Sequence, residues 1–111
     1  MRYKHEAIFC IVNSGYSEAV MDAAKRAGAR GGTIINARGT AGKEAETFVH
    51  ITVQPEKEIV MILVQKEIKE AVLNALYEEV GLDTAGQGIA FSVPVDNVVG
   101  LTASPSKTEE K

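Results

Sequence analysis

The sequence predicts an α+β fold in which two helices cover one face of a four-stranded antiparallel sheet. Short apolar runs rich in Val and Ile alternate with two longer segments whose apolar residues recur every three or four positions. Apolar residues form 45% of the 111-residue chain and aromatic residues only 5%, so the core must be built mainly from aliphatic side chains. No long polar linker precedes the last ten residues, which predicts a single domain.

The first part of the chain predicts a strand, a helix and a second strand. Residues 6–13 form an apolar run that stops at Asn-Ser-Gly, as a buried strand does. The next segment carries a stripe of small apolar residues and predicts a helix, with Ser14 or Ser17 as its N-cap and Gly28 as its C-terminal stop. Residues 33–37 predict the second strand.

The middle of the chain combines a polar loop with two further apolar runs. Residues 38–46 predict the loop, residues 48–53 a half-exposed strand, residues 54–57 a turn, and residues 58–64 a central strand. The carboxylates that alternate with lysines here are interpreted as solvated loop groups: Glu44, Glu46, Glu56 and Glu58.

The second helix has the clearest pattern in the sequence. Between residues 68 and 80 an apolar stripe lies opposite a charged face, and Gly81 follows as a stop signal. A loop over residues 83–88 leads to a strand over residues 89–95 and a short terminal strand over residues 97–101.

These elements predict the ferredoxin-like βαββαβ plan for a domain of residues 1–101, followed by a polar, disordered tail of residues 102–111. Both helices of that plan lie on one face of the sheet. The other face is expected to be equally apolar, because residues 59–64 are apolar throughout. Since an uncovered apolar face favours aggregation, we expect it to be buried in an oligomer.

Composition and charge exclude several classes of function. Twelve basic and fifteen acidic residues give a net charge of −3, which offers no basic face for nucleic acid. No apolar stretch approaches the length of a membrane span or signal-peptide core, so a soluble, cytoplasmic protein is expected. Cys10 lies in an apolar run and is expected to be a buried, inert thiol. His5 and His50 are expected at exposed strand positions, and no pattern predicts a catalytic or metal site.

Two glycine-containing loops are the candidate binding elements. Glycine lets backbone N–H groups turn outward and lets a ligand approach closely, as in anion-binding nests. We expect these loops at the two ends of the sheet. The first loop contributes Arg38, Gly39, Gly42 and Lys43, and the second contributes Thr84, Gly86, Gln87 and Gly88.

The same segments, taken in order, resemble the PII (nitrogen regulatory protein P-II) signalling family over about residues 5–102. Residues 6–8 and the helix that follows resemble its first strand and helix. Residues 32–39, Gly-Thr-Ile-Ile-Asn-Ala-Arg-Gly, resemble its second strand and the root of its regulatory T-loop. Residues 84–91, Thr-Ala-Gly-Gln-Gly-Ile-Ala-Phe, resemble its B-loop, and residues 95–101 resemble its final strand.

The resemblance implies a non-enzymatic regulator of nitrogen metabolism that assembles as a homotrimer. It also implies clefts between subunits that bind adenine nucleotides, lined in this chain by Thr33, Gly39, Gly86 and Gly88. The T-loop would dock onto a membrane transporter or a metabolic enzyme and would change shape with the bound ligand.

Three positions depart from the family pattern and limit the set of ligands that we expect to bind. The phosphate-facing lysine of the family B-loop falls at Ile89, and its two phosphate-facing arginines fall at Gly100 and Thr102. Each lost charge-assisted hydrogen bond is worth about 1.5–3 kcal/mol, so we expect AMP, ADP or a small anion rather than ATP, unless Arg38 and Lys43 compensate. The T-loop is also short and contains no tyrosine, so neither uridylylation nor the 2-oxoglutarate response is expected.

Two alternatives remain open on the same fold. A trimeric metal-binding protein would bring His50, Cys10 or methionine side chains together in space. A small enzyme of the acylphosphatase type would use Arg38 with Asn36 or Asn97 to bind and hydrolyse an acyl phosphate.

Overall fold

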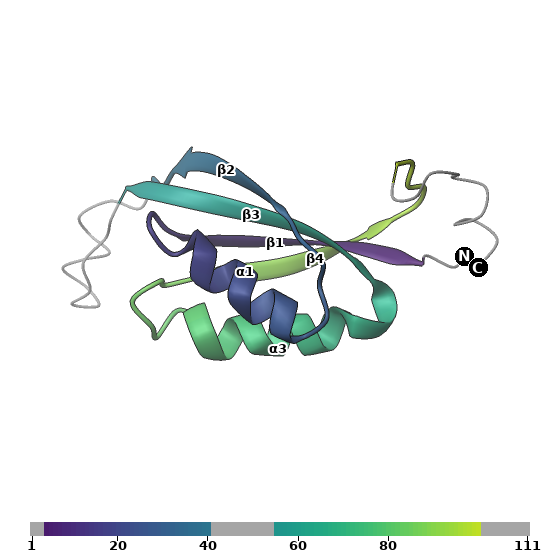
Figure 1. Ribbon diagram of the computed structural model, residues 1–111. Helices are drawn as coiled ribbons and strands as arrows, with labels where there is room; N and C mark the ends of the chain where they lie inside the picture. The colour runs from purple at the N-terminus through teal and green to yellow at the C-terminus, as the bar shows by residue number, and fades with distance from the viewer. Residues whose placement is uncertain (1–3, 41–54, 101–111) are drawn as a thin grey trace.

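The computed structural model describes residues 4–40 and 55–100, and these residues form two layers, with both helices on one face of a single sheet (Figure 1). The predicted ferredoxin-like βαββαβ fold is therefore confirmed. In chain order, the elements are β1 (His5–Asn13), α1 (Ser17–Arg26), β2 (Thr33–Arg38), β3 (Glu56–Gln65), the short 3₁₀ helix η1 (Lys66–Ile68), α3 (Lys69–Val80) and β4 (Ile89–Val95).

The sheet is antiparallel, with strand order β2-β3-β1-β4. In the central strand β1, Phe9 lies opposite Met61 of β3 on one side and Phe91 of β4 on the other. Successive side chains of a strand point to opposite faces. The even-numbered residues of β1, and those of β3 from Val60 to Val64, are buried beneath the helices. The odd-numbered residues lie on the other face, which we call the open face.

The core lies between the helices and these even-numbered residues of the central strands. It is aliphatic, as the composition predicts, and its largest fully buried side chains come from β1, α1, β3 and α3 alike. These residues are Ile8, Cys10, Val12, Val20, Val60, Ile62, Val72, Leu76 and Val80.

The open face is apolar as well, and within the described residues no helix or loop covers it (Figure 1). The rings of Phe9 and Phe91 stack there with centroids 5.4 Å apart. Phe91 nevertheless keeps 46% of its surface exposed, and Ile35, Ile89 and Val93 are exposed to a similar degree. This confirms the expectation that both faces of the sheet are apolar.

Several boundaries differ from the sequence prediction. Glu56 and Lys57 begin β3 instead of belonging to a turn, because they pair in register with Arg38 and Ala37 of β2. Residues 97–100 are not a strand, so that prediction is wrong over the described residues. The reason is geometric: β4 already reaches the start of β1 at Val95, and within residues 4–40 and 55–100 no strand extends beyond this point to pair with. The predicted strand over residues 48–53 and the predicted tail lie outside the described residues.

Candidate functional site

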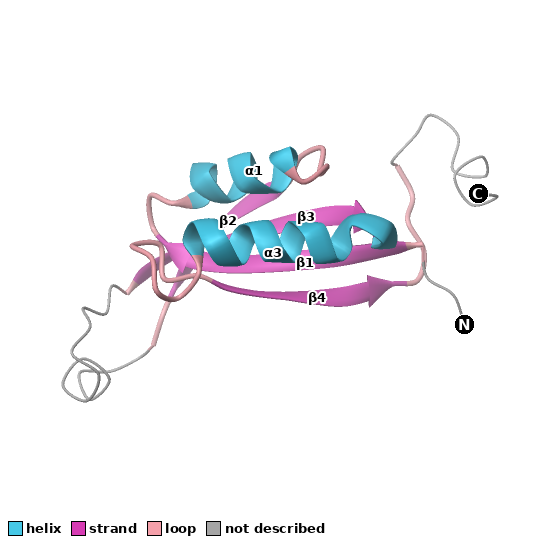
Figure 2. Ribbon diagram, turned by 90° about the horizontal axis from the view of Figure 1, so that it is seen from below, coloured by secondary structure: helices cyan, strands magenta, loops and turns pink. Residues whose placement is uncertain are grey.

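The roots of both glycine loops lie at one end of the sheet (Figures 1 and 2). The backbone N–H of Gly39, after β2, donates to the carbonyl oxygen of Pro55, before β3, at 2.6 Å. The connection from α3 to β4 starts at this same end, because α3 runs back along the sheet from the far end of β3. The expectation that the two loops lie at the two ends of the sheet is therefore wrong.

The loop between α3 and β4 is a compact turn held by its own backbone. The backbone N–H and the hydroxyl of Thr84 both donate to the carbonyl oxygen of Gly81, at 2.9 and 2.7 Å. The N–H of Gln87 donates to the Thr84 carbonyl oxygen at 3.0 Å, and the N–H of Gly88 donates to the Val80 carbonyl oxygen at 2.6 Å. The Thr84 hydroxyl donor is thus used to shape the loop.

At both glycine positions of this loop, the surrounding atoms leave little or no room for a side chain. A Cβ atom at Gly88 would collide with the carbonyl oxygen of Val80 and would lie 3.0 Å from a methyl group of Val12. At Gly86 a Cβ atom would lie 3.3 Å from the Cβ atom of Val80 and 3.5 Å from Tyr16. These glycines let the loop lie close against the ends of α3 and β1.

Asn13 fastens this loop to the sheet and to Lys57. Its backbone N–H donates to the carbonyl oxygen of Gly86 at 2.9 Å, and its side-chain amide donates to the carbonyl oxygen of Ala85 at 3.0 Å. A longer contact of 3.5 Å joins that amide to the side chain of Gln87. Lys57 Nζ donates to Asn13 Oδ1 at 2.7 Å. Asn13 is only 5% exposed, so its hydrogen bonds form in a largely water-free environment.

Glu58 caps the first helix from the neighbouring strand. Its Oε1 atom accepts hydrogen bonds from the backbone N–H groups of Gly15 and Ser17, at 3.1 and 3.3 Å. Tyr16 occupies the N-cap position, and its side chain makes no capping hydrogen bond. The predicted N-cap role of Ser14 or Ser17 is therefore wrong, and so is the interpretation of Glu58 as a solvated loop carboxylate.

The structure brings together only some of the predicted site residues. Gly39 lies with the loop residues Thr84, Gly86, Gln87 and Gly88 at the same end of the sheet.

The other predicted site residues lie elsewhere. Thr33 lies on the open face opposite Met61, near the middle of β3. Arg38 lies opposite Glu56, on the side of the sheet that the helices cover, and Lys43 lies outside the described residues.

The sequence does not identify Asn13, Lys57 or Glu58 as site residues. Their only signal is a polar residue where an apolar run ends or begins, and many solvated residues share that signal. Their importance follows from the pairing of β1 with β3, which places Asn13 opposite Lys57.

Residues 5–104 match the family model described as Nitrogen regulatory protein P-II. The chain belongs to the PII family. It is similar to the solved structure of Arabidopsis thaliana PII bound to citrate, with 26% identity, a TM-score of 0.67, and coverage of 90% of this chain and 82% of that one. A protein described as a PII-like signaling protein, from Thermus thermophilus, shares the fold at 22% identity, with a TM-score of 0.58 and coverage of 86% and 94%. No curated protein gives a sequence match.

Membership in the PII family confirms the predicted non-enzymatic signalling role, because PII proteins are regulators. The arrangement also argues against the acylphosphatase-type pairing of Arg38 with Asn97. Arg38 lies where β2 ends, whereas Asn97 follows the end of β4 at the opposite end of the sheet. None of the described helices is both long and apolar enough to cross a membrane.

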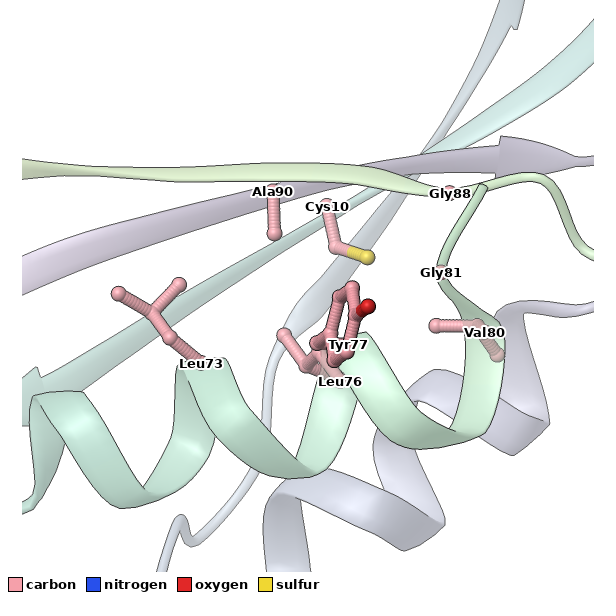
Figure 3. Close-up of a pocket in the computed structure, with 8 residues that line it drawn as sticks. All are labelled: Cys10, Leu73, Leu76, Tyr77, Val80, Gly81, Gly88 and Ala90. Atoms are coloured by element: carbon pink, nitrogen blue, oxygen red, sulfur yellow. The ribbon is translucent and has the colours of Figure 1, made fainter. Parts of the chain in front are cut away.

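Cys10 lies beneath α3, at the floor of a pocket of about 190 Å³ (Figure 3). Leu73, Leu76 and Tyr77 line the helix side of this pocket, and Ala90 lies next to Cys10 on the sheet side. Cys10 is 1% exposed, which confirms its predicted burial. Burial raises the pKa of its thiol to about 11, and a thiol that keeps its proton is a poor nucleophile.

The metal-binding alternative finds no support in the described residues. No three or more His, Cys, Asp or Glu side chains gather there in a way that would hold an ion. His5 is half-buried instead of exposed, because strands pair with β1 on both sides of it, and His50 lies outside the described residues.

Proposed function

We propose that this PII protein is a homotrimeric, cytoplasmic regulator that binds a small effector between its subunits and controls a transporter or a metabolic enzyme. One observation carries the proposal: the root of the T-loop and the B-loop lie at one end of the sheet and are joined there through Asn13 and Lys57. A ligand that contacts the B-loop therefore has a short physical route to the T-loop. The description of the family supports a role in nitrogen metabolism.

The open face supports the proposed trimer. PII proteins are typically trimeric. In this chain the open face presents Phe91, Ile35, Ile89 and Val93, each more than 40% exposed, around the stacked pair of Phe9 and Phe91. Burying such a face contributes about 25 cal/mol for each Å² of apolar surface removed from water, which favours association.

The effector we propose is AMP, ADP or a small anion bound in the cleft between subunits. PII proteins generally bind adenine nucleotides. Thr33 and Gly39 would contribute to the cleft from the β2 side, with Thr84 and Gln87 from the B-loop, and Arg38 and Lys43 at the T-loop root. Ile89 offers no charge to a triphosphate, so ATP is expected to bind weakly. The Arabidopsis thaliana protein bound to citrate supports a role for small anions in this family.

The proposal is tested by measuring the mass of the protein in solution and its binding of AMP, ADP, ATP, cyclic nucleotides and bicarbonate by calorimetry. We expect three times the 11.9 kDa chain mass, and stronger binding of AMP or ADP than of ATP. A stable single subunit would refute the trimer. A trimer that binds none of these compounds would refute the effector-binding role.

A further inference from the structure

The strands of the sheet present side chains of different size to the helices. The central strands β1 and β3 bury branched side chains such as Ile8 and Ile62 there. At the edge of the sheet, Cys10 of β1 is paired with Ala90 of β4, and both residues are small. Because these small residues lie beneath leucine side chains of α3, space remains between the helix and the sheet. This space is the pocket of about 190 Å³ described above.

The walls of the pocket come from the helix, the sheet and the B-loop. Figure 3 shows side chains pointing into the same space from two sides: Leu73, Leu76 and Tyr77 from α3, and Cys10 and Ala90 from the strands. Gly81 and Gly88 line one end of the pocket, where the N–H of Gly88 donates to the carbonyl oxygen of Val80. This end wall is the neck of the B-loop, the point where its two ends meet.

The pocket is separated by the sheet from the cleft that we propose for the effector. That cleft forms where the open faces of neighbouring subunits meet. Cys10 and Ala90 point to the helix-covered side, whereas their neighbours Phe9 and Phe91 stack on the open face. A ligand in this pocket would therefore occupy a second, distinct site.

Two side chains indicate the chemistry of the ligand. Cys10 is 1% exposed, and its thiol makes no hydrogen bond to any of the described residues. A sulfur atom in such a position makes favourable contacts with the edge of an aromatic ring. Tyr77 is 73% exposed, so its ring is accessible to a second ring at the mouth of the pocket. None of the described residues that line the pocket is charged, so an ionic group has no partner there.

We propose that this pocket binds a small, uncharged aromatic molecule about the size of a single benzene ring. The pocket of about 190 Å³ is comparable with an apolar cavity of about 150 Å³ that takes up benzene. The ring lies between the leucines of α3 and Ala90, with its edge toward Cys10 and any hydroxyl group beside Tyr77. It supplies the dispersion contacts that the empty space lacks. Because Gly81 and Gly88 form the end wall, the bound ring also stabilises the neck of the B-loop.

The proposal is tested by titrating the full chain with phenol and with cyclohexanol, followed by nuclear magnetic resonance. Both compounds carry one hydroxyl group on a ring of the same size, but only phenol is aromatic. Ala90→Leu fills the pocket from the sheet side. Ala71→Leu is the matched control, because Ala71 is exposed on α3 and does not line the pocket. Tyr77→Ala removes the aromatic ring at the mouth from an exposed position.

We expect saturable binding of phenol, tighter than that of cyclohexanol, with signal shifts at Cys10 and Ala90 and slower amide exchange at Gly88. Ala90→Leu should weaken phenol binding by at least about tenfold, because the added atoms occupy the pocket. Tyr77→Ala should weaken it by about 2- to 10-fold, the range expected for one aromatic pair, and should affect cyclohexanol less. Ala71→Leu should behave as the wild type.

Three results would overturn the proposal. The first is an absence of saturable phenol binding to the wild-type protein. The second is equal phenol affinity of Ala90→Leu and the wild type; if that variant does not fold, equal affinity of Tyr77→Ala and the wild type has the same meaning. The third is competition between AMP and phenol, which would place phenol in the effector cleft instead of a second site.

Discussion

Replacing Glu58 tests whether the start of α1 depends on a residue of β3. Glu58 Oε1 accepts hydrogen bonds from Gly15 and Ser17, and α1 has no side-chain cap of its own. Glu58→Ala removes both bonds and the negative charge beside the positive end of the helix dipole. Glu58→Gln keeps an acceptor oxygen but removes the charge.

The expected magnitude follows from the exposure of the two donors. Loss of a helix cap costs about 0.5–2 kcal/mol, and a carboxylate near a helix N-terminus adds about 0.3–1 kcal/mol. The hydrogen bond from Gly15 to Glu58 is exposed, so water can replace it at little cost in free energy, whereas the hydrogen bond from Ser17 is partly buried. We therefore expect Glu58→Ala to lower the free energy of unfolding by about 1–2 kcal/mol, and Glu58→Gln by about 0.3–1 kcal/mol.

The assay is urea unfolding followed by circular dichroism, at one fixed protein concentration because assembly also contributes to stability. Glu56→Ala is the matched control. Glu56 is exposed two residues earlier on the same strand, and only its backbone carbonyl, which accepts from Ser14, takes part in the turn before α1. Its loss should change the free energy of unfolding by less than about 0.5 kcal/mol. If Glu58→Ala were no more destabilising than Glu56→Ala, the capping role would be wrong.

Two further predictions concern the B-loop and the buried thiol. Gly88→Ala should destabilise the protein by about 1–3 kcal/mol in the same assay, because the added Cβ atom would collide with the carbonyl oxygen of Val80. Gly31→Ala is the control and should be neutral, because a Cβ atom there would have no neighbour within 4 Å. Equal stability of the two variants would refute the close packing of the loop. Burial raises the pKa of Cys10 from 9.0 to about 11, so between these pH values the folded state keeps a proton that the unfolded state loses. The free energy of unfolding should therefore fall by up to about 3 kcal/mol as pH rises through this window. The Cys10→Ala variant should show a smaller fall over the same pH range. An equal fall in the variant and the wild type would refute the assignment of this pH dependence to Cys10.

The order of elements could be predicted because the apolar periodicity is strong and local. The stripe from residue 68 to residue 80 and the run from residue 6 to residue 13 each identify an element without reference to the rest of the chain. Boundaries failed where pairing decides them. Lys57 belongs to β3 because β2 lies beside it, and residues 97–100 are not a strand because β1 has already ended. Neither boundary can be predicted from the local sequence, because each depends on a strand elsewhere in the chain.

The glycine loops could be found from the sequence, but the groups that join them could not. Lys57 and Asn13 are 44 residues apart, and they meet only because the antiparallel register of β1 and β3 makes them direct neighbours. A register shifted by one residue would send Lys57 to the helix-covered face. The side of the sheet on which a charge lies therefore depends on tertiary pairing, which places Lys57 on the open face and Arg38 on the helix-covered face.

The apolar open face links effector binding to assembly. In the proposed trimer the apolar residues around Phe91 associate, and the clefts between subunits exist only once they have done so. A ligand that binds the trimer alone must then stabilise it, by about 2.7 kcal/mol at one hundred times its dissociation constant. A charge introduced by Phe91→Glu should consequently abolish effector binding, although Phe91 lies opposite Phe9 in the middle of the sheet and not in either loop. Sedimentation with and without AMP distinguishes a loss of assembly from a loss of AMP binding. A monomeric Phe91→Glu variant that binds AMP as tightly as the wild type would show that the site is complete within one subunit.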